Sequence, residues 1–161
     1  MMTDQARHIV CPHCDSVNRI PPQKPADKAK CGRCHNRLFM GRPFPLSTKS
    51  FAAHIQHNDI PVVVDFWAQW CGPCGAMAPV YERAAAELEP DFRFFKVDTE
   101  TEPEFAARYD IRSIPALMLF HRGSVVAQRA GAVDAQTLLS WLRSYSPSSS
   151  SASRASEDRV S

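Results

Sequence analysis

The chain has 161 residues, a formal net charge of +2 and a hydrophobic content of 44%, enough for one compact core. Its apolar runs all fall short of the ~18–20 residues that span a bilayer, and residues 1–8 lack the apolar core of a secretory signal. These features exclude an integral membrane protein and indicate a cytoplasmic one.

All six cysteines belong to three Cys-x-x-Cys pairs, so no cysteine is left over. In a chain without a secretory signal, such pairs are more typical of metal binding or redox chemistry than of a structural disulfide framework. The first two pairs and the third pair lie in regions of different composition, and we consider them separately.

The first two pairs have the spacing of a zinc site. Sixteen residues separate them, and each pair turns tightly enough to offer two sulfurs to a tetrahedral ion. The region is polar and rich in proline, so metal would supply its folding energy. Two disulfides are the alternative, and a reducing compartment disfavours them. His13 and His35 are expected to be solvent-facing neighbours. The expected ligands of one Zn²⁺ ion are Cys11, Cys14, Cys31 and Cys34.

Positive charge is concentrated in the same region. Residues 1–45 hold eight Lys/Arg against three Asp/Glu. A basic zinc ribbon can bind nucleic acid, but Phe39 is the one aromatic residue before position 44, which leaves little surface for base stacking. The favoured interpretation is that the cations offset the net negative charge of four thiolates, and that nucleic acid is not a partner.

The next elements start after a proline-rich stretch, residues 41–45. Thr48 is expected to cap a short helix that carries Phe51 and Ile55 on one face, with His54 and His57 exposed. An apolar, β-branched run then starts at Val62, bounded by Pro61, and is typical of a buried central strand.

After the third cysteine pair, apolar residues recur at helical spacing over about 74–89, with Pro79 expected to kink the helix. A further strand is expected over 92–98. Thr101 to Glu104 has the pattern of a capping box. Residues 116–120 and 125–127 flank a hairpin turn, Asp134 caps a last helix, and the Ser-rich segment 146–161 is expected to be disordered.

The third pair follows the central strand directly. This places Cys71 at a helix N-terminus, where unpaired backbone N–H groups and the helix dipole favour a thiolate. Cys74 lies one turn further in, close enough for a short-loop disulfide. We expect an exposed, nucleophilic Cys71 and a more interior Cys74, forming a dithiol that cycles between reduced and oxidised states.

Several motifs together resemble the thioredoxin family. The segments that carry the resemblance are Trp70-Cys71-Gly72-Pro73-Cys74, Asp65-Phe66-Trp67-Ala68, Ile114-Pro115, and the late glycines Gly123 and Gly131. With the cysteine-rich extension, the chain is similar to the thioredoxin 2 branch. The resemblance implies an α/β thioredoxin fold, a mixed central sheet flanked by helices, behind a small N-terminal zinc ribbon. The implied divisions are 1–41 for the ribbon, 42–145 for the thioredoxin domain and 146–161 for the tail.

The resemblance also implies roles at the site. Cys71 attacks a substrate disulfide and Cys74 resolves the mixed disulfide, with buried Asp65 as the base and Lys96 as its partner. Pro115 is expected to be cis and to lie against Cys71. The implied substrate-binding surface comprises Trp70, Gly72, Pro73 and Ile114. One departure is Gly75, where relatives usually carry Lys or Arg.

The implied activity is protein-disulfide reduction, because Gly-Pro between the cysteines is typical of reductases in this family. Disulfide-containing proteins and a thioredoxin reductase are the implied partners of a monomer without an organic cofactor. The alternative is a zinc-ribbon adaptor whose second domain only docks partners. A further hypothesis is that oxidants eject zinc and unfold residues 8–40, which would remove a basic cover next to the thioredoxin domain and change which substrates reach Cys71. The alternative is a permanently closed zinc site that only tethers the N-terminus.

Overall fold

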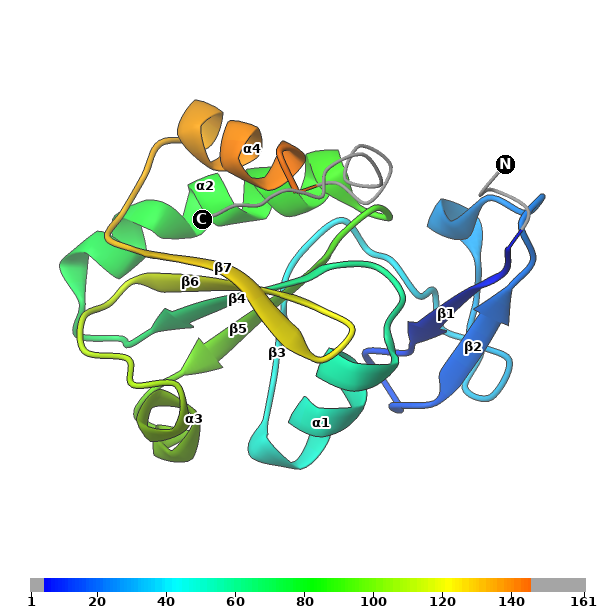
Figure 1. Cartoon of the computed structure of the whole chain (residues 1–161), viewed down its shortest axis with the longest axis horizontal. Coiled ribbons are helices and arrows are strands. Elements are labelled where there is room, and N and C mark those ends of the chain that lie inside the picture. The colour runs from blue at the N-terminus through cyan, green and yellow to red at the C-terminus, as the bar shows by residue number, and fades with distance from the viewer. Residues whose placement is uncertain (1–4, 146–161) are drawn as a thin grey trace.

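The computed structural model describes residues 5–145, which form a five-stranded mixed sheet and a separate two-stranded sheet (Figure 1). The larger sheet has the order β3-β5-β4-β6-β7. β3, β5 and β4 run parallel to one another, and β6 runs antiparallel to both of its neighbours, β4 and β7. The elements are β1 (Arg7–Val10), β2 (Val17–Ile20), the 3-10 helix η2 (Ala26–Lys28), β3 (Phe44–Pro45), α1 (Thr48–His57), β4 (Val62–Trp67), α2 (Gly72–Leu88), β5 (Arg93–Asp98), α3 (Pro103–Arg108), β6 (Ala116–His121), β7 (Ser124–Ala130) and α4 (Ala135–Arg143).

β4 is the centre of the larger sheet, and helices cover both of its faces (Figure 1). Val63 points into a core shared with α2 and α4, whereas Val64 and Phe66 point into a second core with α1 and α3. A strand covered on both faces must be apolar at consecutive positions. The run from Val62, apolar except for Asp65, therefore predicted the right strand, and the expected mixed sheet flanked by helices is confirmed.

Two of the three predicted helix caps differ from the structure. Ser47, not Thr48, caps α1, and its Oγ accepts the Ser50 N–H at 3.3 Å. The expected capping box of Thr101 and Glu104 is absent, because α3 has Glu102 as its N-cap, without a side-chain capping hydrogen bond. The Glu102 carboxylate instead accepts the Thr48 N–H of α1 at 2.9 Å. Asp134 does cap α4, accepting the Thr137 N–H at 2.8 Å.

The two-stranded sheet and its loops as far as Gly41, here called the ribbon, pack against the larger domain. The ribbon has more apolar burial than the sequence suggested. Ile9, Leu38 and Phe39 form a small core that Ile60 of the larger domain completes. Asn58 accepts the Val10 N–H at 2.8 Å, which fixes the same contact with a buried hydrogen bond. The low apolar content of the segment was misleading because part of its core comes from outside it.

A buried ion pair lies beneath the ribbon. Arg93 is fully buried, and its guanidinium lies 3.5 Å from the Glu89 carboxylate. The same guanidinium lies 4.3 Å from the centre of the Phe39 ring and donates to the Val10 carbonyl at 3.4 Å. Burial raises the pKa of Glu89 to about 7, although Arg93 opposes the shift. Charged residues at this depth need partners, and here the ribbon supplies the Phe39 ring and the Val10 carbonyl.

His54 was expected to be exposed, and the structure contradicts this. Its side chain is buried, with Nε2 2.8 Å from an Asp15 carboxylate oxygen of the ribbon. The ring also meets Phe95 edge-on, with centroids 4.8 Å apart. A contact made by a different domain leaves no trace in the helical pattern of α1. His57 is exposed, as expected.

The ribbon lies at the opposite end of the sheet from the start of α2 (Figure 1). Its contacts include Asn58 and Ile60, which precede β4, whereas Cys71 follows β4. The ribbon therefore packs on the thioredoxin domain at a distance from Cys71. Six residues of extended strand, about 20 Å, separate the two ends.

Candidate active site and metal centre

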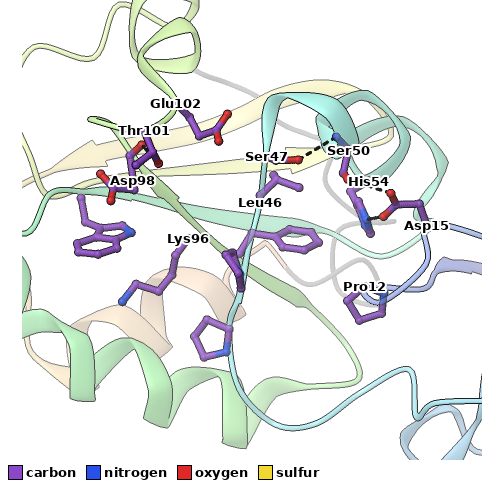
Figure 2. A pocket seen from close by; sticks show the side chains of 14 residues that line it. Pro12, Asp15, Leu46, Ser47, Ser50, His54, Lys96, Asp98, Thr101 and Glu102 are labelled. Carbon is purple, nitrogen blue, oxygen red and sulfur yellow. Dashed lines mark hydrogen bonds and ion pairs between the residues drawn. The ribbon is translucent and has the colours of Figure 1, made fainter.

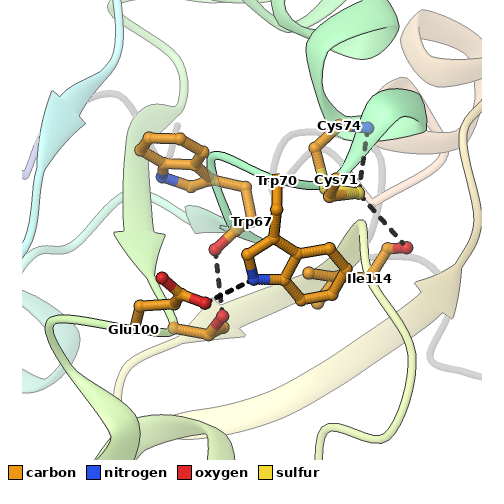
Figure 3. The surroundings of a disulfide bond; sticks show 7 residues. Trp67, Trp70, Cys71, Cys74, Glu100 and Ile114 are labelled. Carbon is orange, nitrogen blue, oxygen red and sulfur yellow. Dashed lines mark hydrogen bonds between the residues drawn. A yellow bond between two sulfur atoms is a disulfide. The ribbon is translucent and has the colours of Figure 1, made fainter.

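The third cysteine pair lies where β4 passes into α2. Cys71 is the N-cap of this 17-residue helix, and its sulfur accepts the Cys74 N–H at 3.2 Å. The two cysteines form a disulfide, as the spacing allows (Figure 3). Their exposed fractions are 6% and 5%, so both are buried. Cys71 is therefore not more exposed than Cys74, contrary to expectation. The two sulfurs differ in hydrogen bonding instead: among the described residues, the Cys71 sulfur accepts an N–H and the Cys74 sulfur accepts none.

Ile114 and Pro115 complete one side of the dithiol. The Ile114–Pro115 peptide bond is cis, as the motif implied. The Ile114 carbonyl oxygen lies 3.8 Å from the Cys71 sulfur, and Ile114 packs on the small cluster that contains both cysteines (Figure 3). Segments 43 residues apart in the chain therefore meet at one sulfur.

Exposed side chains surround the same point. Trp70 is 68% exposed, and its indole N–H donates to the carboxylate of Glu100 (Figure 3). Gly72 and Pro73 are exposed at the first turn of α2. A Cβ at Gly75 would meet no atom within 4 Å, so packing does not require glycine there. Glu100 was not among the residues singled out from the sequence, and no local motif marks it.

Asp65 lies on β4, opposite Lys96 of β5 in the register of the two strands. It is 2% exposed, and its Oδ1 has no hydrogen-bond partner among the described residues. Burial raises the pKa of this carboxyl to about 7, and the Lys96 charge partly opposes that shift. The Lys96 ammonium lies 4.7 Å from the centre of the Trp67 ring. The two groups are close enough to influence each other, without an ion pair between them in the described structure.

The other two pairs come together in the ribbon. Their four sulfurs all lie within 4.8 Å of one another, with Cys11–Cys34 and Cys14–Cys31 separations of 3.6 Å. None of the four is in a disulfide, which argues against the two-disulfide alternative. Each pair turns back through a left-handed residue, Asp15 at φ 66° and His35 at φ 69°. Four thiol groups in such a cluster fit a tetrahedral zinc ion.

Hydrogen bonds prepare part of the cluster for a metal. The Cys31 sulfur accepts N–H groups from Cys34 and Arg33 and the Asn18 side-chain amide. Burial opposes ionisation of Cys31, yet these donors together lower its pKa to about 5. Cys11 is more deeply buried, and burial raises its pKa to about 12. A cation among the sulfurs would displace the remaining protons. His13 and His35 are exposed and lie outside the cluster, as expected.

Comparison with known proteins places both parts of the chain. Residues 42–144 match the family model described as Thioredoxin, and residues 10–36 match the model for the thioredoxin 2 N-terminal region. Thioredoxin C-3 of Corynebacterium nephridii is 40% identical over 134 residues, covering 83% of this chain and 92% of that protein. The chain belongs to the thioredoxin family.

Two further relatives extend this comparison. The thioredoxin of Porphyra purpurea is 47% identical over 96 residues, which cover 60% of this chain and 90% of that protein. The crystal structure of Malassezia sympodialis thioredoxin (Mala s 13) has a TM-score of 0.62 and 29% identity, covering 71% of this chain and 99% of that one. The expected thioredoxin fold with an N-terminal ribbon is thus confirmed.

The thioredoxin family assignment also confirms the activity. The chain is a protein-disulfide reductase, and its Cys-x-x-Cys active site is Cys71–Cys74. The ribbon carries the four-cysteine site of the thioredoxin 2 type. None of the helices within residues 5–145 is long and apolar enough to cross a membrane.

A cavity of about 320 Å³ runs between the ribbon and the thioredoxin domain (Figure 2). Pro12 and Asp15 of the ribbon form one wall, and Lys96 and Trp67 line it further along. Asp15 also accepts the Ser50 hydroxyl at 2.9 Å, in addition to its contact with His54. No sequence motif predicted this cavity, because its walls come from four segments that are separate in the chain.

Proposed function

We propose that Cys71 is the attacking sulfur and Cys74 the resolving one. The observation that carries this assignment is the N-cap position of Cys71, whose sulfur accepts the Cys74 N–H at 3.2 Å. An N–H donor and the positive end of a helix dipole stabilise a thiolate at that sulfur.

The proposed reaction consists of two successive thiol–disulfide exchanges, in which the Cys71–Cys74 dithiol supplies both electrons. The Cys71 thiolate attacks one sulfur of the substrate disulfide, forming a mixed disulfide and releasing the other sulfur as a thiolate, which takes up a proton. The Cys74 thiol then loses its proton and attacks the Cys71 sulfur. This attack breaks the bond between Cys71 and the substrate, whose second sulfur leaves as a thiolate and takes up a proton. The substrate has gained two electrons and is now a dithiol, while Cys71 and Cys74 have lost two electrons and form a disulfide. An external dithiol then reduces that disulfide.

We propose Asp65 as the acceptor of the Cys74 proton. Its buried carboxyl, with a pKa of about 7, can change protonation state near neutral pH. Lys96 is proposed to tune that carboxyl through its charge, since it lowers the same pKa. The proposal requires Asp65 to act through the interior of the domain, because its side chain is buried.

The proposed substrate-binding surface surrounds the Cys71 sulfur. An extended substrate chain would pair with the backbone at Ile114 beside Pro115, and would pack on exposed Trp70, Gly72 and Pro73. Pro115 lacks an N–H and leaves the neighbouring carbonyl free for this purpose.

For the ribbon, we propose that its four cysteines hold one Zn²⁺ ion with a structural role. The sulfur cluster and its N–H donors support this. A redox-sensitive zinc site is the second candidate, favoured by the partial exposure of Cys14 and Cys34. Steric cover of Cys71 cannot be part of it, given where the ribbon lies.

The remaining proposals concern context. We propose a cytoplasmic monomer that reduces disulfide-containing proteins, receives electrons from a thioredoxin reductase and needs no organic cofactor. We propose divisions at 1–41 and 42–145; the expected disordered tail, 146–161, lies outside the described residues. Family membership supports these partners.

Trapping tests the assignment of the two sulfurs. Cys74→Ser should accumulate mixed disulfides with insulin on Cys71, detectable by mass spectrometry, while Cys71→Ser should form none. Insulin turbidity with dithiothreitol as the reductant separates a reductase from an adaptor that only docks partners. Faster labelling of Cys74 than of Cys71 by iodoacetamide in the reduced protein would reverse the proposed roles.

A further inference from the structure

The ribbon carries more positive charge than its known parts require. Residues 5–41 contain seven Lys/Arg and two Asp. One of the two, Asp15, is already engaged by His54 and Ser50 of the thioredoxin domain. Clustered like charges raise the free energy of a folded protein, so the excess of Lys and Arg on this small ribbon suggests a functional role.

Neutralisation of the sulfur cluster does not use these cations directly. The side-chain donors to the four sulfurs are the amides of Asn18 and Asn36, and backbone N–H groups supply the rest. Within residues 5–145, no Lys or Arg side chain donates to any of the four sulfurs. The interpretation favoured from the sequence, that the cations offset the thiolates, therefore lacks contact support.

Four of the cations instead line one hollow on the ribbon, with a volume of about 390 Å³. None of its lining side chains is a carboxylate, and within residues 5–145 none of the four cations takes part in an ion pair. The rest of the lining is aliphatic or proline. The lining residues are Arg19, Ile20, Pro21, Lys24, Pro25, Lys28, Ala29 and Lys30.

The backbone around the hollow is held in place. The Lys24 N–H donates to the Pro21 carbonyl at 3.1 Å, and the Ala29 N–H donates to the Ala26 carbonyl at 3.1 Å. Prolines at 21, 22 and 25 restrict the loop further. A restricted loop loses less conformational entropy when it binds a partner, so the four cations are suited to recognition.

We propose that this hollow docks a Glu/Asp-rich segment of a protein whose disulfide is reduced at Cys71–Cys74. Four unpaired cations complement several carboxylates. The apolar lining is limited to Ile20, two prolines and Ala29, with no aromatic side chain, so charge is the main basis for binding. Nucleic acid fits less well, because none of the lining side chains is aromatic and bases would find nothing to stack on.

The hollow lies far from the dithiol, so we expect it to form a second contact with the substrate and to take no part in the chemistry. The ribbon and the dithiol lie at opposite ends of the sheet, so both can engage one large substrate at the same time (Figure 1). A tethered second contact raises the effective concentration of the substrate without touching the chemistry. The docking site should therefore lower KM for acidic substrates and leave kcat unchanged.

Binding is tested on the full-length protein with fluorescein-labelled octaglutamate and with a labelled oligothymidine of equal charge. We expect the peptide to bind more tightly than the oligonucleotide at low salt. Lys24→Gln/Lys28→Gln should weaken peptide binding about five- to tenfold, since each exposed charge pair shifts an equilibrium by up to roughly fivefold. The matched control is Lys49→Gln/Arg108→Gln, which removes two exposed cations from the thioredoxin domain and should change binding less than twofold.

Kinetics supply an independent readout. One disulfide peptide is prepared with and without a flexibly linked octaglutamate tail. The tail should lower KM about fivefold for the native protein and the control, but not for Lys24→Gln/Lys28→Gln, while kcat and zinc content stay equal in all three. Equal losses in both double variants, no peptide binding, or tighter binding of the oligonucleotide would overturn the proposal.

Discussion

The same Cys-x-x-Cys spacing serves two purposes in this chain, and the backbone after it makes the difference. In the ribbon, left-handed residues Asp15 and His35 turn each pair back on itself, and four sulfurs converge. After Cys74 the chain continues instead as the helix α2, which isolates two sulfurs at its N-terminus. The spacing brings two sulfurs together, and the next residue decides whether they face a metal or a substrate.

The two regions also differ in how they are held together. The thioredoxin domain buries two apolar cores, one on each face of its sheet. The ribbon has a single small core that Ile60 completes, together with the Arg93–Glu89 pair beneath Phe39. We therefore expect the thioredoxin domain to fold by itself, and the ribbon to depend on both the proposed zinc ion and its neighbour.

The largest expected effect separates the two kinds of cysteine pair. Cys71→Ser should lower insulin reduction by at least about a thousandfold, because the attacking sulfur is gone. Its zinc content should remain one ion per chain. Cys31→Ser is the matched variant and should show the reverse, losing zinc while the dithiol still reduces insulin. Loss of both properties in either variant would show that the regions are not independent.

The second prediction concerns the buried Arg93–Glu89 pair beneath the ribbon. Arg93→Met should lower the free energy of unfolding by about 3–4 kcal/mol, since it leaves the Glu89 carboxylate buried without its cation. Urea titration at pH 8 measures the change. Arg93→Met/Glu89→Gln removes both charges and should recover part of the loss. A loss below about 1 kcal/mol in the single variant would show that the pair does not support the interface.

The third prediction concerns Asp65. Its folded pKa of about 7 lies above the ordinary 3.8, so the cost of burying the ionised group grows from about pH 4 and is complete above about pH 7. Asp65→Asn should therefore raise the free energy of unfolding by about 2–4 kcal/mol at pH 8, with little change at pH 4. Turnover should fall about tenfold or more.

The control for Asp65→Asn is Asp91→Asn, an exposed position where neither stability nor turnover should change. The pH dependence is the sharper measurement. Reduction by the native protein should rise through neutral pH as Asp65 ionises, and Asp65→Asn should flatten that rise. A native rate that is constant from mildly acidic to mildly alkaline pH would exclude Asp65 as the proton acceptor.

The smallest expected effect is at the ribbon contact with His54. Asp15→Ala removes a half-exposed partner and should lower the free energy of unfolding by about 1 kcal/mol. The exposed Asp27 offers a control, since Asp27→Ala should be neutral within about 0.5 kcal/mol. Equal effects of the two substitutions would show that the His54 contact adds nothing to docking.

Local patterns predicted most of the fold. The apolar run that starts at Val62 and the helical spacing after Cys74 each depend on residues close in the chain. The start of the strand and both ends of the helix were predicted within about two residues. The cis bond before Pro115 followed from a motif. Both wrong caps were one residue from the observed ones: Ser47 rather than Thr48 caps α1, and Glu102 rather than Thr101 precedes α3. The bond between Glu102 and Thr48 spans 54 residues, a pairing that no local rule contains.

Contacts between the two regions were the part that the sequence did not predict. His54 has the spacing of an exposed helix residue, but a ribbon carboxylate and the Phe95 ring bury it. Arg93 starts a strand where a solvated charge would be ordinary, and burial depends on Phe39 from the ribbon. Glu100 became part of the site only because the fold brings it to Trp70.

The division of labour between the cysteine pairs is tested most directly by native mass spectrometry during a redox titration. The reduced, zinc-loaded protein is oxidised stepwise in dithiothreitol buffers, and the disulfides are then mapped by peptide mass. We predict that the first step lowers the mass by two hydrogens, joins Cys71 to Cys74 and leaves one zinc ion bound. Zinc release in that first step, or a first disulfide among the ribbon cysteines, would contradict the account.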